Sequence, residues 1–558
     1  MNEVRIGVFV CHCGTNIGNY VDVPEVVEYV ETLPDVVYAE SNRYSCSSDG
    51  LQKLQEAIKN HDLNRVVVAS CSPRTHEPLF QSACMEVGLN KYLFEMANIR
   101  DQCSWVHMHE PLKATAKAKD LVRMAVAKAR LLTPEEEPEI EIQPVALVIG
   151  GGVSGMTTAL SLEDQGFTVH LVEKTGKLGG SLNDLDSLFP SNIRGEEVLT
   201  PLLDRLADSK NIYVYLDSEV QTVNGFLGNF DVEIRRQGED VPINVGTIIL
   251  ATGAEYFEPK GLYRFELENV ITQRELEHLI AEDKLKEFKK IVMIQCVGAR
   301  NEERPYCSRI CCSEAMKNAK LLADEDSDRD IVVLYRDLQT YGLDYTEMEW
   351  SAKKRGVKLV KYEQECPPIV ERDDSGLHVS LYTQLLGEEL TLNPDLVVLS
   401  VPLIPNPDNK KLSQLLKVPL NSDGFFMEAH VKLRPVDFAT DGVYVCGTAH
   451  SPKMVAESIA QAKGAASRAG IPMAKGFVKT AAYTSVIDED SCSGCGTCVE
   501  LCPYKAITKN EKGLAEVIAA VCKGCGVCGA SCPEKAITMK HFTNEEIDAQ
   551  GVAALKEG

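Results

Sequence analysis

The feature that most constrains the fold is a cysteine run near the C-terminus that occurs twice. Each copy places four cysteines at the same spacing and ends on a proline: Cys492, Cys495, Cys498, Cys502 and Pro503, then Cys522, Cys525, Cys528, Cys532 and Pro533. The segments after the two runs, PYKAIT and PEKAIT, also match. Because such self-similarity marks a duplicated structural unit, residues 481–558 are predicted to form one small α+β domain with two cysteine-lined sites.

The spacing of these runs is that of bacterial ferredoxins with two [4Fe–4S] clusters, in which the fourth cysteine of each run binds the other cluster. On this pattern cluster one takes Cys492, Cys495, Cys498 and Cys532, and cluster two takes Cys522, Cys525, Cys528 and Cys502. Glycines within both runs let the backbone approach a cluster. The alternative is a pair of zinc sites, which three closely spaced cysteines followed by Cys-Pro disfavour.

The chain has 558 residues, 20 cysteines and a net charge of −24. Disulfide-dense proteins are usually short and secreted, whereas this chain is long and begins with MNEVRIGVFVCHCG, which does not resemble a signal peptide. No stretch reaches the roughly 18 apolar residues of a membrane span. We therefore expect a cytoplasmic protein with reduced, metal-binding thiols. The acidic balance also disfavours nucleic acid and anionic membranes as partners.

A second motif follows an acidic, proline-bearing segment, residues 132–143, that is predicted to be a linker. In PVALVIGGGVSGMTTALSLEDQGFTVHLVEK an apolar strand, a glycine turn, a helix and a second strand follow one another. Gly150, Gly152 and Gly155 form the dinucleotide fingerprint, Val153 and Ser154 open the helix, and Glu173 ends the second strand as a ribose ligand. The alternative is a glycine turn without a ligand.

Further segments of residues 144–480 favour FAD over NAD, because they resemble flavoproteins with two dinucleotide-binding domains, of which thioredoxin reductase is one. The predicted FAD contacts beyond the fingerprint are Lys174, Gly179, Gly180, Ala251, Thr252, Gly253, Gly447 and Thr448. In such flavoproteins the segment after Gly447 leads into a helix whose positive end faces the flavin, and here that helix is expected to begin near residues 450–453.

Four more cysteines stand where these flavoproteins carry a second glycine turn for NAD(P)H: Cys296, Cys307, Cys311 and Cys312. We interpret them as a cluster site in place of the nicotinamide site, and the alternative is four unligated buried thiols. Lys317 follows on the same predicted helix. It is either a solvated helix lysine or a catalytic cation near the flavin N5 or the cluster.

Residues 1–131 alternate short apolar strands with helical stretches, so they are predicted to form an α/β domain. Cysteines follow its strands, and the carboxyl edge of such a sheet is where ligands bind. The predicted ligands of an N-terminal cluster are Cys11, Cys13, Cys46, Cys71 and Cys103. Cys84 is predicted to be core packing. Structural thiols are the alternative for the whole group, since it contains no CxxC spacing.

Taken together, FVCHCGTNI, VVVASCSPRTHEPLF, LFEMANIRDQCSWVH, the flavin fingerprint, the Cys307-x3-Cys311-Cys312 run and the terminal cysteine repeat resemble the A subunit of heterodisulfide reductase. The resemblance covers essentially the whole chain and corresponds to a short form, because residues 181–246, where longer members insert a cysteine-rich ferredoxin domain, contain no cysteine.

This resemblance implies a cytoplasmic, anaerobic iron–sulfur flavoprotein, an oxidoreductase with FAD and about four [4Fe–4S] clusters. It also implies B and C subunits as partners, an electron-donating hydrogenase, formate dehydrogenase or similar module, ferredoxin, and a homo-oligomer within a heteromeric complex. Its flavin would split electron pairs between ferredoxin and a disulfide.

Two other functions remain open at the level of the sequence. One is an NAD(P)H-dependent flavin oxidoreductase with a fused ferredoxin, of the glutamate synthase small-subunit kind, against which the missing second glycine turn counts. The other is a non-catalytic iron–sulfur scaffold that keeps the flavin fold only for assembly.

Overall fold

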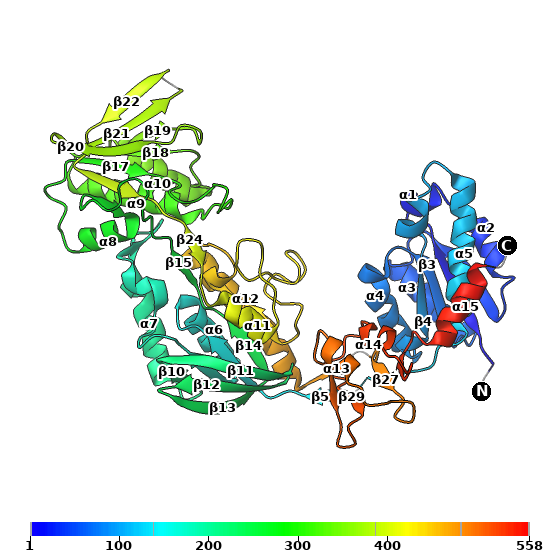
Figure 1. Cartoon of the computed structure of the whole chain (residues 1–558). Coiled ribbons are helices and arrows are strands. Elements are labelled where there is room, and N and C mark those ends of the chain that lie inside the picture. Colours follow the sequence, from blue (N-terminus) through cyan, green and yellow to red (C-terminus); the bar gives the residue numbers. More distant parts are fainter. Residues whose placement is uncertain (1–2, 138, 385–386, 480–481, 556–558) are drawn as a thin grey trace. The chain divides into compact units, whose positions relative to one another are not determined.

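The computed structural model describes residues 3–137, 139–384, 387–479 and 482–555. The chain divides into two compact units, of which one joins residues 1–139 to 479–558 and the other holds residues 140–478 (Figure 1). The chain passes between the units at β5 (Glu139–Glu141) and β26 (Phe477–Lys479). Within the described residues, no helix is long and apolar enough to cross a bilayer.

The first unit begins with a parallel sheet in the order β2-β1-β3-β4. Its strands are β1 (Ile6–Cys11), β2 (Val36–Asn42), β3 (Arg65–Ser70) and β4 (Phe94–Asn98). The helices are α1 (Thr15–Gly18), α2 (Val23–Val30), α3 (Ser48–Asn60), α4 (Pro73–Glu86) and α5 (Pro111–Ala129), with short turns η1 (Lys91–Leu93) and η2 (Arg100–Ser104). Every residue of β1 is buried, as expected for a parallel strand with both faces covered.

The C-terminal part of this unit consists of two antiparallel strand pairs and short helices. β27 (Ser485–Ile487) pairs with β30 (Ile537–Met539), and β28 (Ile507–Lys509) pairs with β29 (Ala515–Val517). The helices are α13 (Thr497–Leu501), α14 (Val527–Ala530) and α15 (Asn544–Ala554). The pairing of β27 with β30 brings the start of the domain to the segment after its second cysteine run, so the two halves interlock.

Buried polar and aromatic contacts hold the two parts of the first unit together. α15 lies alongside α5 (Figure 1), where Arg123 Nε donates to the Ala553 carbonyl over 2.8 Å. The Glu95 carboxylate accepts from Lys128 Nζ at 2.8 Å and lies 3.5 Å from His541 Nε2. Because these pairs join residues far apart in the chain, the terminal domain and the N-terminal domain pack as one unit.

The second unit contains a parallel sheet in the order β10-β7-β6-β14-β25, which is that of the dinucleotide-binding fold. Its strands are β6 (Val145–Ile149), β7 (Thr168–Val172), β10 (Ile212–Tyr215), β14 (Thr247–Leu250) and β25 (Val443–Val445). Around it lie α6 (Val153–Glu163), α7 (Gly195–Asp208), α11 (Asn409–Leu416) and α12 (Val455–Lys475), and an antiparallel sheet of β11 (Ser218–Phe226), β12 (Asn229–Arg236) and β13 (Glu239–Val245).

Residues 254–405 repeat this plan. A parallel sheet in the order β16-β23-β17-β18-β19 consists of β16 (Val270–Thr272), β17 (Lys290–Ile294), β18 (Asp330–Tyr335), β19 (Lys358–Lys361) and β23 (Leu396–Leu399). Its helices are α8 (Gln273–Ala281), α9 (Ile310–Glu325) and α10 (Leu343–Lys354), and its antiparallel sheet is β20 (Ile369–Asp373), β21 (Gly376–Thr383) and β22 (Glu388–Leu392).

The two halves are connected by β15 (Ala254–Tyr256), which pairs with β24 (Leu403–Pro405). The remaining short elements are β8 (Ser187–Leu188), β9 (Ile193–Arg194), η3 (Gly180–Asp184) and η4 (Gly447–Ala449). The mixed α/β architecture predicted from the sequence is thus present in both units.

Candidate functional site

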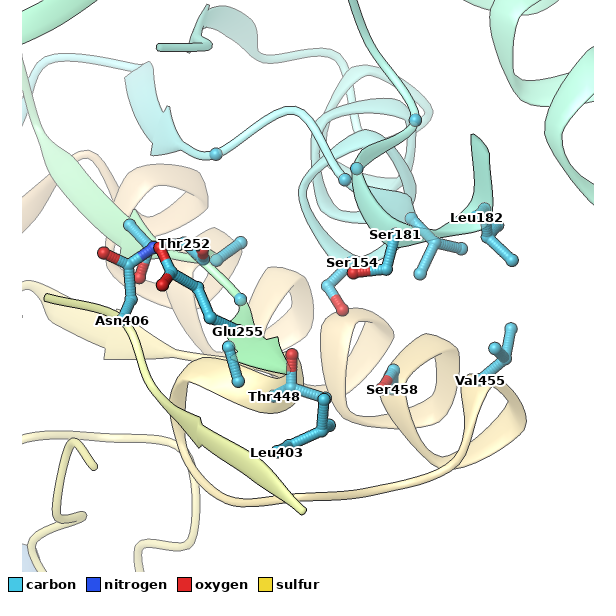
Figure 2. Close-up of a pocket in the computed structure, with 18 of the residues that line it drawn as sticks. Ser154, Ser181, Leu182, Thr252, Glu255, Leu403, Asn406, Thr448, Val455 and Ser458 are labelled. Atoms are coloured by element: carbon cyan, nitrogen blue, oxygen red, sulfur yellow. Dashed lines mark hydrogen bonds between the residues drawn. The ribbon is translucent and has the colours of Figure 1, made fainter. Parts of the chain in front are cut away.

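A cavity of about 540 Å³ opens at the carboxyl ends of β6, β7 and β14 in the second unit. Figure 2 shows its lining, with Thr252, Glu255 and Asn406 toward one end and Leu182 and Val455 toward the other. Helix α6 begins at its wall, so the partial positive charge of that helix end points toward a bound anion. The carboxyl edge of a parallel sheet is the usual ligand site of this fold.

At Gly150, in the turn between β6 and α6, and at Gly155, in the first turn of α6, neighbouring backbone approaches too closely for any side chain. A Cβ on Gly150 would lie 2.4 Å from the Ala251 carbonyl oxygen, and a Cβ on Gly155 would lie 1.8 Å from the Gly150 oxygen. Gly150 also has φ of 112°, which L residues rarely adopt. The fingerprint implies that α6 packs closely against the preceding strand, and glycine is therefore required at these positions.

Glu173 fixes the loops around this turn. One carboxylate oxygen accepts from the Gly151 N–H at 2.7 Å, and the other accepts from the Thr175 N–H and hydroxyl at 2.8 Å. The carboxylate therefore stands at the edge of the cavity beside the turn, in the position that a ribose ligand needs.

The cavity fits a dinucleotide by the residues that line it. Thr252 Oγ1 is buried and lacks a hydrogen-bond partner among the described residues, so a ligand could satisfy it. Most predicted FAD contacts lie in the wall: Gly150, Gly152, Val153, Ser154, Glu173, Lys174, Gly179, Gly180, Ala251, Thr252, Gly253 and Thr448. Gly155 and Gly447 lie behind it, and a Cβ on Gly447 would meet Ser154 Oγ at 2.3 Å.

Sequence reasoning did not predict the part of the cavity wall that comes from residues 403–408, which include β24, and from α11. This group contributes Leu403, Asn406, Pro407, Asp408, Lys411 and Leu412. No motif marks these residues, because β24 reaches the cavity only by pairing with β15.

Lys317 lies in the wall of the same cavity and is 1% exposed. Its ammonium donates to the Glu277 carboxylate and, over 2.8 Å, to the Ser187 carbonyl. Glu277 is itself 1% exposed. Lys317 is therefore a buried cation with a buried partner, and the solvated lysine that the sequence left open does not describe it.

Glu314 completes this buried group one turn before Lys317. Burial, and then the neighbouring Glu277 charge, raise the pKa of its carboxyl to about 7, although Lys317 and Arg274 act against the shift. One of its oxygens is buried without a partner among the described residues. The cavity wall thus contains two buried carboxyls, of which Glu277 accepts from the Lys317 ammonium and Glu314 is influenced by its charge alone.

Another cation, Lys453, lies in the cavity wall just before α12. Its ammonium donates to the carbonyls of Gly447 and Ser451 over 3.0 and 2.9 Å. Burial, and then the Arg309 charge, lower its pKa to about 8. The helix expected near residues 450–453 begins at Val455, with Lys453 beside its positive end.

Because the pKa of Lys453 falls from 10.5 to about 8 on folding, unfolding takes up a proton between these values and stability rises with pH in that window. Replacing Lys453 by methionine should remove this rise and increase the free energy of unfolding by about 1–2 kcal/mol at pH 7. Urea unfolding between pH 7 and 10 checks this. Lys463→Met, at an exposed lysine of α12, is the control, and equal pH profiles for the two variants would contradict the expectation.

The four cysteines of residues 296–312 lie between the end of β17 and the first turn of α9 and influence one another's pKa, but within the described residues their side chains are not arranged as a group that could hold a metal ion. Burial, and then the nearby thiols of Cys312 and Cys307, raise the pKa of Cys296 to about 11. A hydrogen bond with Cys312, and then burial, raise the pKa of Cys311. The same hydrogen bond lowers the pKa of Cys312, which lies in the first turn of α9, where a helix N-terminus also favours a thiolate. The helix that begins with Cys311 and Cys312 also reaches the cavity, because Ile310, Glu314 and Lys317 of α9 line it.

Four of the five predicted N-terminal ligands, Cys11, Cys13, Cys46 and Cys71, lie at the carboxyl ends of β1, β2 and β3, although the described side chains there do not form a group that could hold a metal ion. Cys11 Sγ accepts from the Cys13 N–H at 3.3 Å. Burial raises the pKa of Cys46, and the neighbouring thiols of Cys11 and Cys13 raise it further. The pKa of Cys71 is also raised by burial, opposed by Arg100, with Cys13 and Cys46 among its neighbours.

The fifth, Cys103, is placed differently. Its thiol is fully buried and donates to the Ala114 carbonyl over 3.1 Å, which packs it against α5. Cys84 lies in the hydrophobic core of this domain, as the sequence predicted. A neighbour that the sequence did not indicate is His76, whose Nδ1 lies 3.2 Å from Cys71 Sγ.

In the C-terminal domain, the cysteines assigned to cluster two line one small cavity: Cys502, Cys522, Cys525 and Cys528. Cys502 comes from the first run and the others from the second, so cysteines of both runs line this cavity, as the ferredoxin spacing leads one to expect. A Cβ on Gly524 would lie 2.2 Å from the backbone carbonyl oxygen of Tyr483, which explains why this loop has a glycine. Cys498 is one of the cysteines assigned to cluster one. Burial raises its pKa, and the neighbouring thiols of Cys495 and Cys492 raise it further.

Comparison with known proteins gives the same two modules. Residues 145–296 match the pyridine nucleotide-disulphide oxidoreductase family and residues 485–539 match the 4Fe-4S dicluster domain family. Among solved structures, thioredoxin reductase of T. acidophilum aligns with 18% identity and a TM-score of 0.41, over 59% of this chain and 97% of that one.

Curated relatives cover the whole chain. The A subunit of the H(2):CoB-CoM heterodisulfide,ferredoxin reductase of Methanothermobacter thermautotrophicus is 41% identical over 100% of this chain and 98% of its own. The iron-sulfur A subunit of the CoB–CoM heterodisulfide reductase of Methanocaldococcus jannaschii is 36% identical over 91% of each chain. This protein is therefore an oxidoreductase with a pyridine nucleotide-disulphide oxidoreductase domain and a C-terminal 4Fe-4S dicluster domain, and it belongs to the family of heterodisulfide reductase A subunits.

Proposed function

We propose that this chain is the electron-transfer component of a heterodisulfide-reductase-like complex, with FAD as the junction between iron–sulfur clusters. The observation that carries the proposal is the position of α9. Its first turn holds Cys311 and Cys312, and its next turns place Glu314 and Lys317 in the wall of the FAD cavity. One helix thus connects a cysteine site to the flavin site.

When bound, FAD supplies the chemistry of exchanging electrons as a pair or singly. The residues of the chain provide the surroundings for that exchange. The turn at Gly150 and the start of α6 bind the pyrophosphate, apolar wall residues such as Leu188 and Phe189 exclude water, and Lys317 presents a positive charge fixed by Glu277.

Four sets of cysteines are proposed as cluster ligands, which corresponds to about four [4Fe–4S] clusters. The N-terminal set is Cys11, Cys13, Cys46 and Cys71, the middle set is Cys296, Cys307, Cys311 and Cys312, and the last two are clusters one and two. Cys103 is left out of the first set because its thiol donates to Ala114 instead.

The names of the relatives extend the proposal to partners. Several name a CoB-CoM heterodisulfide, and some also name ferredoxin and H(2) or formate. We infer that this chain works in the cytoplasm with B and C subunits and ferredoxin, receives electrons from a hydrogenase or formate dehydrogenase module, divides electron pairs at its flavin, and forms a homo-oligomer within the complex.

The test is a cofactor analysis of the anaerobically purified chain. We expect about one FAD and about four clusters of iron and sulfide per chain. Cys311→Ala should lose roughly a quarter of the iron, whereas Cys366→Ala, at an exposed cysteine outside the four sets, should lose none. Fewer than about two clusters, or no FAD, would refute the proposal.

The same preparation separates the two competing functions. Rapid reduction of the flavin by NADH or NADPH would favour the NAD(P)H oxidoreductase of the glutamate synthase kind. Full cofactor loading without electron transfer to B and C subunits would favour a scaffold.

A further inference from the structure

The two halves of the ferredoxin domain differ at one buried position. Ser485 opens β27 and Ala515 opens β29, each at the same offset before the first cysteine of its own run. Their exposed fractions are 5% and 4%. The repeat therefore places a hydroxyl in one half where the other half has a methyl group.

The hydroxyl of Ser485 lies among the cysteines of cluster two. Its Oγ is 3.1 Å from Cys528 Sγ and 3.7 Å from Cys522 Sγ, and Ser485 lines the same small cavity as these cysteines. A cysteine bound to iron is a thiolate without a hydrogen, so it can only accept. In the loaded protein the hydroxyl is thus the donor.

We propose that Ser485 donates a hydrogen bond to the Cys528 ligand of cluster two and makes this cluster easier to reduce. The proposal rests on the ligand sets proposed above. Reduction adds one electron from a reductant to the cluster, while no bond breaks and the proton stays on Oγ. Because reduction increases the negative charge on the sulfurs, the hydrogen bond stabilises the reduced state more than the oxidised state.

Burial makes this contact stronger than the polar contacts of the other half. Thr497 Oγ1 lies 3.5 Å from Cys495 Sγ, and Lys509 Nζ lies 2.7 Å from the Gly494 carbonyl. Cys495 and Lys509 are exposed, so water competes for these contacts and weakens them.

The affected cluster is the one on the side of the N-terminal domain. Its loop meets the Tyr483 carbonyl at Gly524. The Tyr483 hydroxyl accepts from Gln81 Nε2 at 3.1 Å and lies 3.3 Å from the Glu77 carboxylate, both on α4. Helix α4 begins at Pro73, two residues after Cys71, so the loop of cluster two lies next to a residue that packs against the helix following the N-terminal cysteines.

The test is a redox titration of the full-length, anaerobic protein with dithionite, followed by electron paramagnetic resonance. Ser485→Ala should lower the equilibrium constant for reduction of one ferredoxin-domain cluster about tenfold, which is about 59 mV for one electron. Ala515→Ser should raise that of the other cluster, and Ser485→Thr, which keeps the hydroxyl, should stay near the wild-type value.

The number and intensity of the electron paramagnetic resonance signals, together with the iron content, distinguish the possible failures. Wild-type protein without two ferredoxin-domain signals would refute the proposed function itself. Two signals in full amount, with no shift in Ser485→Ala, would refute only the role of Ser485. Loss of the cluster in Ser485→Ala would also refute it, because the serine would then be needed to hold the cluster rather than to adjust its potential.

Discussion

Replacing Lys317 by methionine is expected to lower the free energy of unfolding by about 3–5 kcal/mol. The ammonium is the partner of Glu277 in a place where both side chains are 1% exposed. Removing it leaves a buried carboxylate without its counter-charge, with Glu314 as a second buried carboxyl beside it. The flavin should become harder to reduce in the same variant, since a positive charge leaves the cavity wall. Urea unfolding and a flavin redox titration measure the two effects.

The loss should depend on pH. Lys317 lowers the pKa of the Glu314 carboxyl, so its removal lets burial and the Glu277 charge raise that pKa further. A carboxyl with a raised pKa costs stability once the pH exceeds its unfolded value. We therefore expect a larger loss at pH 8 than at pH 5, and recovery of more than half of it when Glu277→Gln is added. Lys353→Met, which removes the partly exposed i,i+4 ion pair with Glu349 on α10, should cost only about 0.3–0.5 kcal/mol. A similar small loss for Lys317→Met would contradict the expectation.

Lys317 also shows how far sequence reasoning reaches. Its position on a helix after the cysteine run made it a candidate, but both a solvated and a functional role fitted that position. The choice depends on Glu277 and Ser187, which lie on α8 and β8. Such contacts between distant segments leave no pattern in the sequence.

The cysteine sites also differ in how far the sequence could predict them. The terminal repeat indicated the domain and its exchange of cysteines because the spacing is local and specific. The N-terminal group has no such spacing, and order along the chain could not show that Cys103 turns toward the Ala114 carbonyl while Cys11, Cys13, Cys46 and Cys71 stay near enough to influence one another's pKa. The ends of the predicted strands indicated that the cysteines lie at the carboxyl edge of the sheet. Which thiols lie close together at that edge depends on the direction of each side chain, which the sequence does not show.

The alignment with the relative from Methanothermobacter thermautotrophicus runs over 650 positions, more than the 558 residues of this chain. The relative thus carries residues that this chain lacks. Residues 181–246 form α7 and the antiparallel sheet β11–β13 without any cysteine. The FAD fold is complete without an insertion there, because β10 and β14 pair directly with neighbours in the parallel sheet.

The second large effect is expected at Gly155. An alanine Cβ there would lie 1.8 Å from the Gly150 carbonyl oxygen, and this contact is with backbone, which cannot rotate away as a side chain would. Helix α6 must therefore shift from the turn that holds the pyrophosphate. Overpacking of this kind costs about 1–3 kcal/mol or more, and a shift that weakens FAD binding by about 3 kcal/mol lowers the affinity about 100-fold.

We accordingly expect Gly155→Ala to be purified with little or no FAD, while its iron and sulfide content stays near wild type because the cysteine sites do not include α6. Gly464→Ala is the matched control, since Gly464 is a helical glycine of α12 in the same unit with open space at its Cβ position. That variant should keep FAD and gain about 0.5–1 kcal/mol of stability. Full FAD content in Gly155→Ala would mean that the turn at Gly150 does not carry the dinucleotide, and the assignment of the cavity to FAD would fall with it.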